Sequence, residues 1–155
     1  MRFARWLSVV ARRRAPNCLH GVGERWQYRC VALADRPLVP EEWVLRIDAV
    51  LGALPRCRQE SAWTGTRWRV GSATVAHVFG GEDQLFRITF RGEPDEVAAF
   101  EHMGDPYFRA GWGGNYIGML LDDETDWDEL AELLTDSYCI QAPARLADQV
   151  ARPDA

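Results

Sequence analysis

The sequence of 155 residues contains no lysine, so all 18 of its Lys and Arg residues are arginines. This bias indicates genomic composition first, and selection for bidentate binding of anions only second. Long apolar runs are also missing: none approaches the roughly 18 to 20 residues that a membrane-spanning helix needs. The apolar stretch at residues 6–11 is shorter than the core of a secretory signal. We therefore expect a cytoplasmic protein without a membrane span.

Signatures of metal sites are absent as well. The four cysteines form no CxxC pair, and the three histidines form no HxxxH or HExxH pair. Cys18, His20 and Cys30 could supply three ligands of a zinc site, but no fourth ligand follows at a suitable spacing. The acidic run at residues 122–129 lacks the alternate ligands and central glycine of a calcium loop, and suits the start of a helix. We expect no metal, no cofactor, and free thiols in a reducing compartment.

Signatures of catalysis are missing too. Ser137, Tyr138 and Cys139 adjoin one another, but no nucleophile elbow and no Cys and His frame surrounds them. His77 alternates with apolar residues in a predicted strand, which favours a hydrogen-bonded, half-buried histidine. The glycines at residues 111, 113 and 114 precede a strand, whereas phosphate loops lead into a helix. The sequence predicts a protein that is not an enzyme.

Charge divides the chain into two parts. Residues 1–38 hold eight arginines and two acids, a net charge of +6, whereas residues 39–155 hold ten arginines and 21 acids, a net charge of -11. The first part can form a basic amphipathic segment that touches membrane or nucleic acid. We favour a disordered extension, or a reading frame begun upstream of the true start. We expect a single domain at 39–151 and a short tail at 152–155.

Hydrophobic periodicity predicts the elements of that domain. A 3.6-residue period predicts a helix at 40–53, and further helices are expected near 94–103, from 126, and at 143–150. A period of two, with glycine turns, predicts three antiparallel strands within residues 61–92 and another strand at 115–121. The fold class is therefore α+β: a two-layer sandwich in which an antiparallel sheet of about four strands is backed by helices.

Arginines alternate with apolar residues in two of the predicted strands, so one polar face of the sheet collects four of them. These are Arg67, Arg69, Arg87 and Arg91. Their guanidinium groups can hold phosphates, with Trp63 or Trp112 as a stacking surface. The alternative is that they pair with nearby carboxylates, which are Glu60, Glu93 and Asp95.

Residues 39–151 resemble the MmcQ/YjbR family. The similar motifs are RWRVG, EPDEVAAF, YFRAGWGGNYIGMLL and DWDELAELLTDSYCIQAPARL, in that order. The resemblance implies a frataxin-like α+β fold, sometimes described as a double wing, and a non-catalytic DNA-binding role. It also implies a basic contact near the final helix, where this chain has Arg145. DNA is thus the expected partner, and a protein partner is a second candidate.

A protein-binding or small-ligand-binding module without nucleic-acid affinity is the alternative function. Aromatic residues would then line a pocket or a contact patch, and the candidates are Trp112, Tyr107, Phe108 and Tyr116.

Overall fold

The computed structural model describes residues 36–111 and 113–151. Residues 36–38, the end of the expected extension at 1–38, are described. The expectations for residues 1–35, for Trp112 and for the tail at 152–155 lie outside the described residues. The elements are α1 (Glu41–Leu51), β1 (Cys57–Ser61), β2 (Thr66–Val70), β3 (Ala73–Gly80), β4 (Phe86–Arg91), α2 (Pro94–Met103), β5 (Tyr107–Arg109), β6 (Tyr116–Leu121), α3 (Trp127–Gln141) and α4 (Ala144–Ala147).

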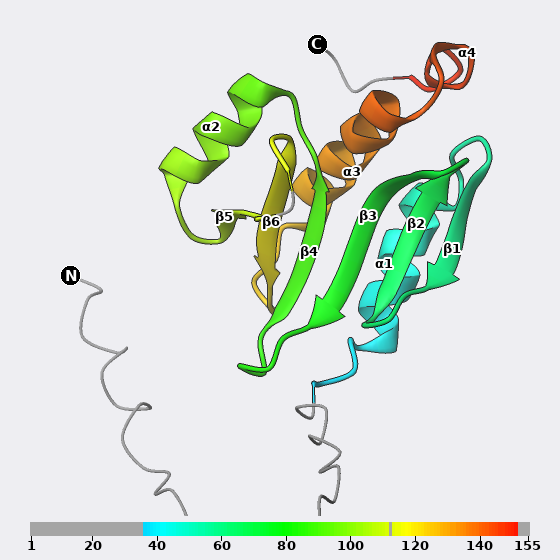
Figure 1. Cartoon of the computed structure of the whole chain (residues 1–155). Coiled ribbons are helices and arrows are strands. Elements are labelled where there is room, and N and C mark those ends of the chain that lie inside the picture. Colours follow the sequence, from blue (N-terminus) through cyan, green and yellow to red (C-terminus); the bar gives the residue numbers. More distant parts are fainter. Residues whose placement is uncertain (1–35, 112, 152–155) are drawn as a thin grey trace, which may run out of the picture. The chain divides into compact units, whose positions relative to one another are not determined.

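All these strands form one antiparallel sheet of six strands in the spatial order β1-β2-β3-β4-β6-β5. Helices α1 and α3 lie behind the sheet in Figure 1 and cover one of its faces. The predicted α+β two-layer sandwich is confirmed. Its sheet has six strands where we expected about four.

The two additional strands are β1 and β5, which form the two edges of the sheet. Strand β1 reads CRQES and contains no fully buried residue, while β5 has only three residues. Neither carries the alternation of apolar and polar residues that identifies a strand from sequence. Pairing with a neighbouring strand decides their structure.

The core lies between the sheet and helices α1 and α3. Trp68 of β2 is fully buried, and its indole Nε1 donates a hydrogen bond of 2.8 Å to Asp48 on α1. On α3, Leu130, Leu134 and Tyr138 are each exposed by 1% or less. The predicted apolar side of this helix is confirmed.

Side chains determine where α3 and α2 begin. The carboxylate of Asp126 accepts hydrogen bonds from the backbone N–H groups of Asp128 and Glu129, so part of the acidic run is used to start α3, as predicted. Helix α2 begins with a capping box formed by Glu93 and Glu96, which the sequence analysis did not anticipate.

Helices α1 and α4 are shorter than predicted. Helix α1 ends at Leu51, and α4 has four residues in place of the eight expected at 143–150. No helix in the described parts of the chain is long and apolar enough to cross a membrane.

Candidate nucleic-acid interface

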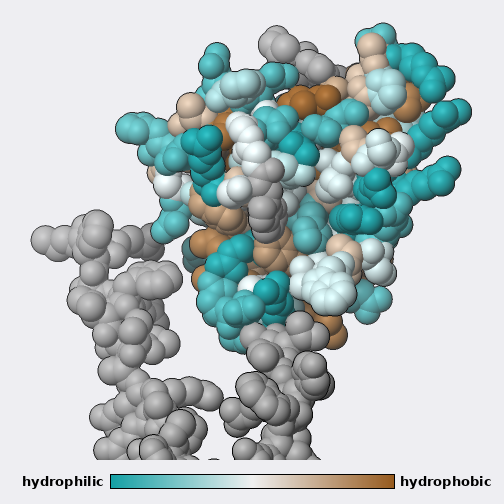
Figure 2. Space-filling view, in the orientation of Figure 1, coloured by the Kyte–Doolittle hydropathy of each residue, from teal (hydrophilic) through white to brown (hydrophobic). Residues whose placement is uncertain are grey.

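The strands turn one set of side chains away from the helices, and we call this surface the open face. Its central row crosses all six strands in the order Glu60, Arg67, His77, Thr89, Gly118 and Phe108. The same strand registers place further side chains on the open face, beside this row: Arg58, Arg69, Thr74, Phe79, Arg87, Arg91, Tyr116 and Leu120. Directly opposed residues of antiparallel strands point to the same side. Figure 2 shows hydrophilic residues over much of this side of the molecule, with apolar patches between them.

Two of the predicted arginines share one carboxylate. Glu60 accepts from Arg67 at 3.2 Å and from Arg69 at 3.4 Å, and Arg69 also donates to the carbonyl of Ser72 at 2.7 Å. The expected pairing with Glu60 is therefore present. One carboxylate balances only one of the two guanidinium charges, so this pair keeps a positive charge.

Arg87 binds the turn between β3 and β4. Its two terminal nitrogens donate to the two carboxylate oxygens of Asp83 at 2.8 and 2.5 Å. This hydrogen-bonded partner lowers the pKa of Asp83 to about 2. The other expected partners, Glu93 and Asp95, form no ion pair with a described arginine. That expectation was wrong, because both acids lie at the start of α2, and Glu93 is used there in the capping box.

Arg91 has neutral partners. Its guanidinium donates to Asn115 Oδ1 at 2.5 Å and to the hydroxyl of Tyr116. The guanidinium carbon also lies 3.3 Å from the centroid of the Tyr116 ring. These contacts orient the arginine and the aromatic ring together, and no carboxylate of a described residue forms an ion pair with Arg91.

A fifth arginine of the open face, Arg58, was missed. It lies directly opposite Arg69 in the register of β1 and β2, it is exposed, and it forms no ion pair with a described residue. The signal that would have found it is the recognition of β1 as a strand. Once β1 pairs with β2, the period of two places Arg58 and Glu60 on the open face.

The open face differs in charge from the rest of the domain. Its five arginines, balanced by Glu60 and by Asp83 in the adjacent turn, give a net charge of +3. The described residues together hold ten arginines and 20 acids, a net charge of -10. Most of the acids belong to α1, α2, α3 and the loop before α3.

The remaining predicted site residues lie in different places. Trp63 stands in the turn between β1 and β2 with 91% of its surface exposed, so it is available for stacking. Arg145 is exposed on α4, outside the central row. Tyr107 is buried, with 5% of its surface exposed, and it faces the core beside Phe100 of α2. Its expected place in a pocket lining was therefore wrong, whereas Phe108 and Tyr116 do lie on the open face.

His77 joins the Trp63 turn to the sheet. Its Nε2 donates to the carbonyl of Thr64 at 2.5 Å, because a carbonyl can only accept. Burial lowers the pKa of His77 below its ordinary value of 6.5, and the charge of Arg67 acts in the same direction. His77 is half-buried and hydrogen-bonded, as the sequence predicted.

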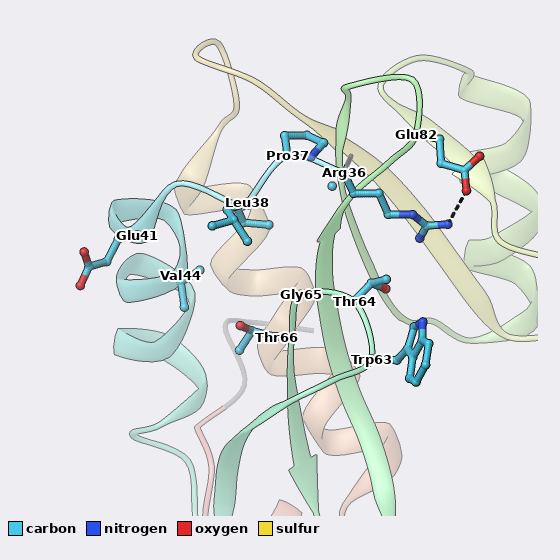
Figure 3. Close-up of a pocket in the computed structure, with 12 residues that line it drawn as sticks. Arg36, Pro37, Leu38, Glu41, Val44, Trp63, Thr64, Gly65, Thr66 and Glu82 are labelled. Carbon is cyan, nitrogen blue, oxygen red and sulfur yellow. Dashed lines mark hydrogen bonds and ion pairs between the residues drawn. The ribbon is translucent and has the colours of Figure 1, made fainter. Parts of the chain in front are cut away.

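A groove of about 800 Å³ lies at the end of the sheet near the Trp63 turn. Figure 3 shows its walls, which are the segment at residues 36–39, the start of α1 and the turn between β1 and β2. Arg36 reaches across to Glu82 at 2.9 Å. Leu38, which is 91% exposed, and Val44 give the groove an apolar side.

The adjoining residues considered as nucleophiles have structural positions. Ser137 is fully buried; its hydroxyl donates to the carbonyl of Val75 at 2.7 Å and accepts from the backbone N–H of Arg91 at 2.8 Å. The hydroxyl of Tyr138 donates to the carbonyl of Pro55. Among the described residues, no group of three or more His, Cys, Asp or Glu side chains has the arrangement of a metal site.

Comparison with known proteins identifies relatives of this arrangement. A family model described as YjbR matches residues 52–140. A solved structure from Deinococcus radiodurans, protein DR2400 with a DUF419 domain, superimposes with a TM-score of 0.54 at 16% identity, covering 72% of this chain and 90% of that one. A protein from Pseudomonas syringae superimposes with a TM-score of 0.54 at 12% identity, covering 68% of this chain and 100% of that one. At these identities the likeness is one of fold. No curated protein matches the chain.

Proposed function

The chain belongs to the YjbR family, and from this membership and the charge of the open face we propose that it is a non-catalytic DNA-binding protein. The observation that carries the proposal is the separation of charge within the domain. The open face has a net charge of +3, although the described residues together have a net charge of -10.

The acidic helices oppose this binding only weakly. Interactions between exposed charges that are farther apart than the Debye length, about 8 Å at physiological salt, are largely screened. A phosphate at the open face therefore interacts mainly with the arginines of the strands. Most acids of the helix layer are exposed to solvent on the other side of the sheet, so solvent ions largely screen them from that phosphate.

The existing ion pairs do not prevent the arginines from binding phosphate. The side chains of Arg67 and Arg69 are 39% and 26% exposed, and Glu60 is 40% exposed. Exposed pairs of this kind contribute about 0 to 1 kcal/mol each. A phosphate can replace or join the carboxylate, and it offers the planar arginine side chains a bidentate acceptor.

The test is a salt titration of DNA binding by the full chain and its variants. Arg58→Ala should weaken binding and reduce the slope of log affinity against log salt by about 0.9 for duplex DNA, because one phosphate contact is lost. Glu60→Gln should strengthen binding, because it removes the carboxylate between Arg67 and Arg69. Both effects should be nearly independent of DNA sequence.

The matched control is Arg46→Ala, which removes an exposed arginine from α1, where it lies over the ring of Trp127. It changes the net charge as Arg58→Ala does, but on the covered side of the sheet. Equal losses for the two variants would contradict an interface on the open face. Loss of binding only on replacing Arg12, Arg13 and Arg14 would move the contact to the basic extension.

A second candidate function, binding of a small ligand, is favoured by the groove in Figure 3. Its volume of about 800 Å³ lies within the range of ligand pockets. If the groove binds apolar molecules, the fluorescent probe anilinonaphthalene sulfonate should bind the native protein, and Leu38→Glu should abolish that binding. Unchanged probe binding in the variant would remove the support for this function.

A further inference from the structure

A small hollow of about 250 Å³ lies on the open face, between the Trp63 turn and β6. Arg67, His77 and Thr89, which are neighbours in the central row, line its floor. Trp63 and Tyr116 contribute an aromatic ring each from two different parts of the chain. The hollow therefore combines aromatic walls with hydrogen-bonding groups and one guanidinium.

The wall formed by Trp63 is fixed through its backbone. Gly65 has a φ of +70°, and a Cβ atom there would lie 1.9 Å from the carbonyl oxygen of Val78, so the turn is pressed against β3. The hydrogen bond between His77 and Thr64 holds the same turn. The indole nevertheless remains 91% exposed. An aromatic ring that is exposed on a held backbone is prepared for stacking.

The opposite wall is also held. Arg91 stacks on the ring of Tyr116 and is itself held by Asn115. One side of the tyrosine ring is thus occupied by a cation, and the ring keeps its orientation. The Tyr116 wall therefore exists before any ligand binds, whereas on the Trp63 side the backbone is held and the exposed indole can turn to meet a base.

A second hollow, of about 530 Å³, continues from the first across the sheet. Thr89 lines both hollows, and the second one is bounded by Phe79, Phe108 and Arg87. Gly118 lies beneath the ring of Phe108, where a Cβ atom would approach that ring to 2.3 Å. Two neighbouring hollows, each with aromatic rings and arginine, follow one another across β2, β3, β4, β6 and β5. Two acids, Glu82 and Asp83, also line the second hollow, and each is paired with an arginine.

Such a track fits unpaired bases. In a duplex the bases are stacked and paired inside the helix, whereas in a single strand they can turn outward and stack on aromatic side chains. We infer that the open face binds single-stranded nucleic acid in preference to duplex, with one base between Trp63 and Tyr116 and a neighbouring base beside Phe108. This inference rests on the proposed function, and it specifies the form of the nucleic acid.

The test compares a DNA single strand of mixed sequence with the duplex formed from it and its complement, using the full chain. The single strand should bind more tightly. Trp63→Ala should weaken its binding by about 5- to 150-fold, the range expected for the loss of one stacked base, and should leave duplex binding unchanged. Trp63→Phe should restore most of the affinity. An RNA single strand of the same sequence shows whether the open face prefers single-stranded DNA or single-stranded RNA.

Leu38→Ala is the matched control, because Leu38 is also 91% exposed but lies in the groove outside the open face. It should leave single-strand affinity unchanged. Equal binding of strand and duplex that Trp63→Ala does not alter would overturn the inference and leave the proposed function intact. Absence of binding to either form would overturn both. Preserved thermal unfolding of Trp63→Ala shows that the variant is folded.

Discussion

At the scale of single residues, identical side chains on the open face have different availability because their partners differ. Arg87 is held by both oxygens of Asp83, and Arg91 is held by neutral groups. Arg58 is exposed without a described ion pair. The residue type gives each of them a positive charge, but its surroundings decide whether a phosphate can reach it.

His77 should make the stability of the protein depend on pH. Because burial lowers its pKa in the folded protein, the unfolded chain binds a proton that the folded chain does not as the pH falls below about 6.5. The free energy of unfolding should therefore decrease as the pH falls through that value. His77→Gln keeps a donor for Thr64 and cannot titrate, so it should flatten the decrease. Urea unfolding at several pH values measures the free energy of unfolding. An equal dependence on pH in the wild-type protein and the variant would show that another group causes the decrease.

Gly65 should tolerate alanine less well than Gly71 does. Both have a positive φ, but a Cβ atom would meet Val78 only at Gly65 and would meet nothing within 4 Å at Gly71. Gly71→Ala should cost about 1 kcal/mol for the left-handed backbone. Gly65→Ala should cost about 1 to 3 kcal/mol more, because the turn must move. Urea unfolding of the two variants gives the difference, and equal costs would contradict the close approach.

At the scale of elements, α3 is the helix that joins the core to the open face. Its apolar residues pack beneath the sheet, and Ser137 accepts from the backbone N–H of Arg91 at the end of β4. The start of the helix is fixed by Asp126, so the register of its buried side relative to the sheet is fixed as well. Loss of packing in α3 should therefore affect the whole domain.

Leu134→Ala tests the packing of α3. Leu134 is 1% exposed, so the substitution should lower the free energy of unfolding by about 2 to 5 kcal/mol, through lost burial and the cavity that remains. Leu45→Ala on α1 is the control, because Leu45 is 61% exposed and its loss should change stability by no more than about 0.5 kcal/mol. A change under about 0.5 kcal/mol for Leu134→Ala would show that this side of the helix is not packed.

At the scale of the whole described domain, charge is distributed by layer. The helices and their loops carry most of the acids, while the strands carry the arginines of the open face. The net charge alone predicts repulsion of a polyanion, whereas the arrangement allows attraction at one surface. Which of the two dominates depends on the distance over which salt screens the charges.

Salt should separate the effects of the two layers on DNA affinity. Glu60→Gln on the open face should strengthen binding at about 0.15 M salt. Glu132→Gln, at an exposed residue of α3 on the other side of the sheet, should have little effect, because its charge lies more than a Debye length of about 8 Å from the open face and is screened by solvent ions. At about 0.01 M salt that length is about 30 Å, and both variants should strengthen binding. Equal effects at the higher salt concentration would contradict an interface confined to the open face.

The sequence by itself determined the α+β class, the sides of the long helices and the common face of Arg67, Arg69, Arg87 and Arg91. Periods of 3.6 and 2 separate an apolar side from a polar side within each segment, and the apolar sides of the strands must all face the same core. Tertiary structure decided which carboxylates accompany those arginines, that β1 brings Arg58 beside them, and that the Trp63 turn is held next to Tyr116. These contacts join residues from different strands and turns. They are set by strand register and by the folding of turns onto the sheet, which no local period encodes.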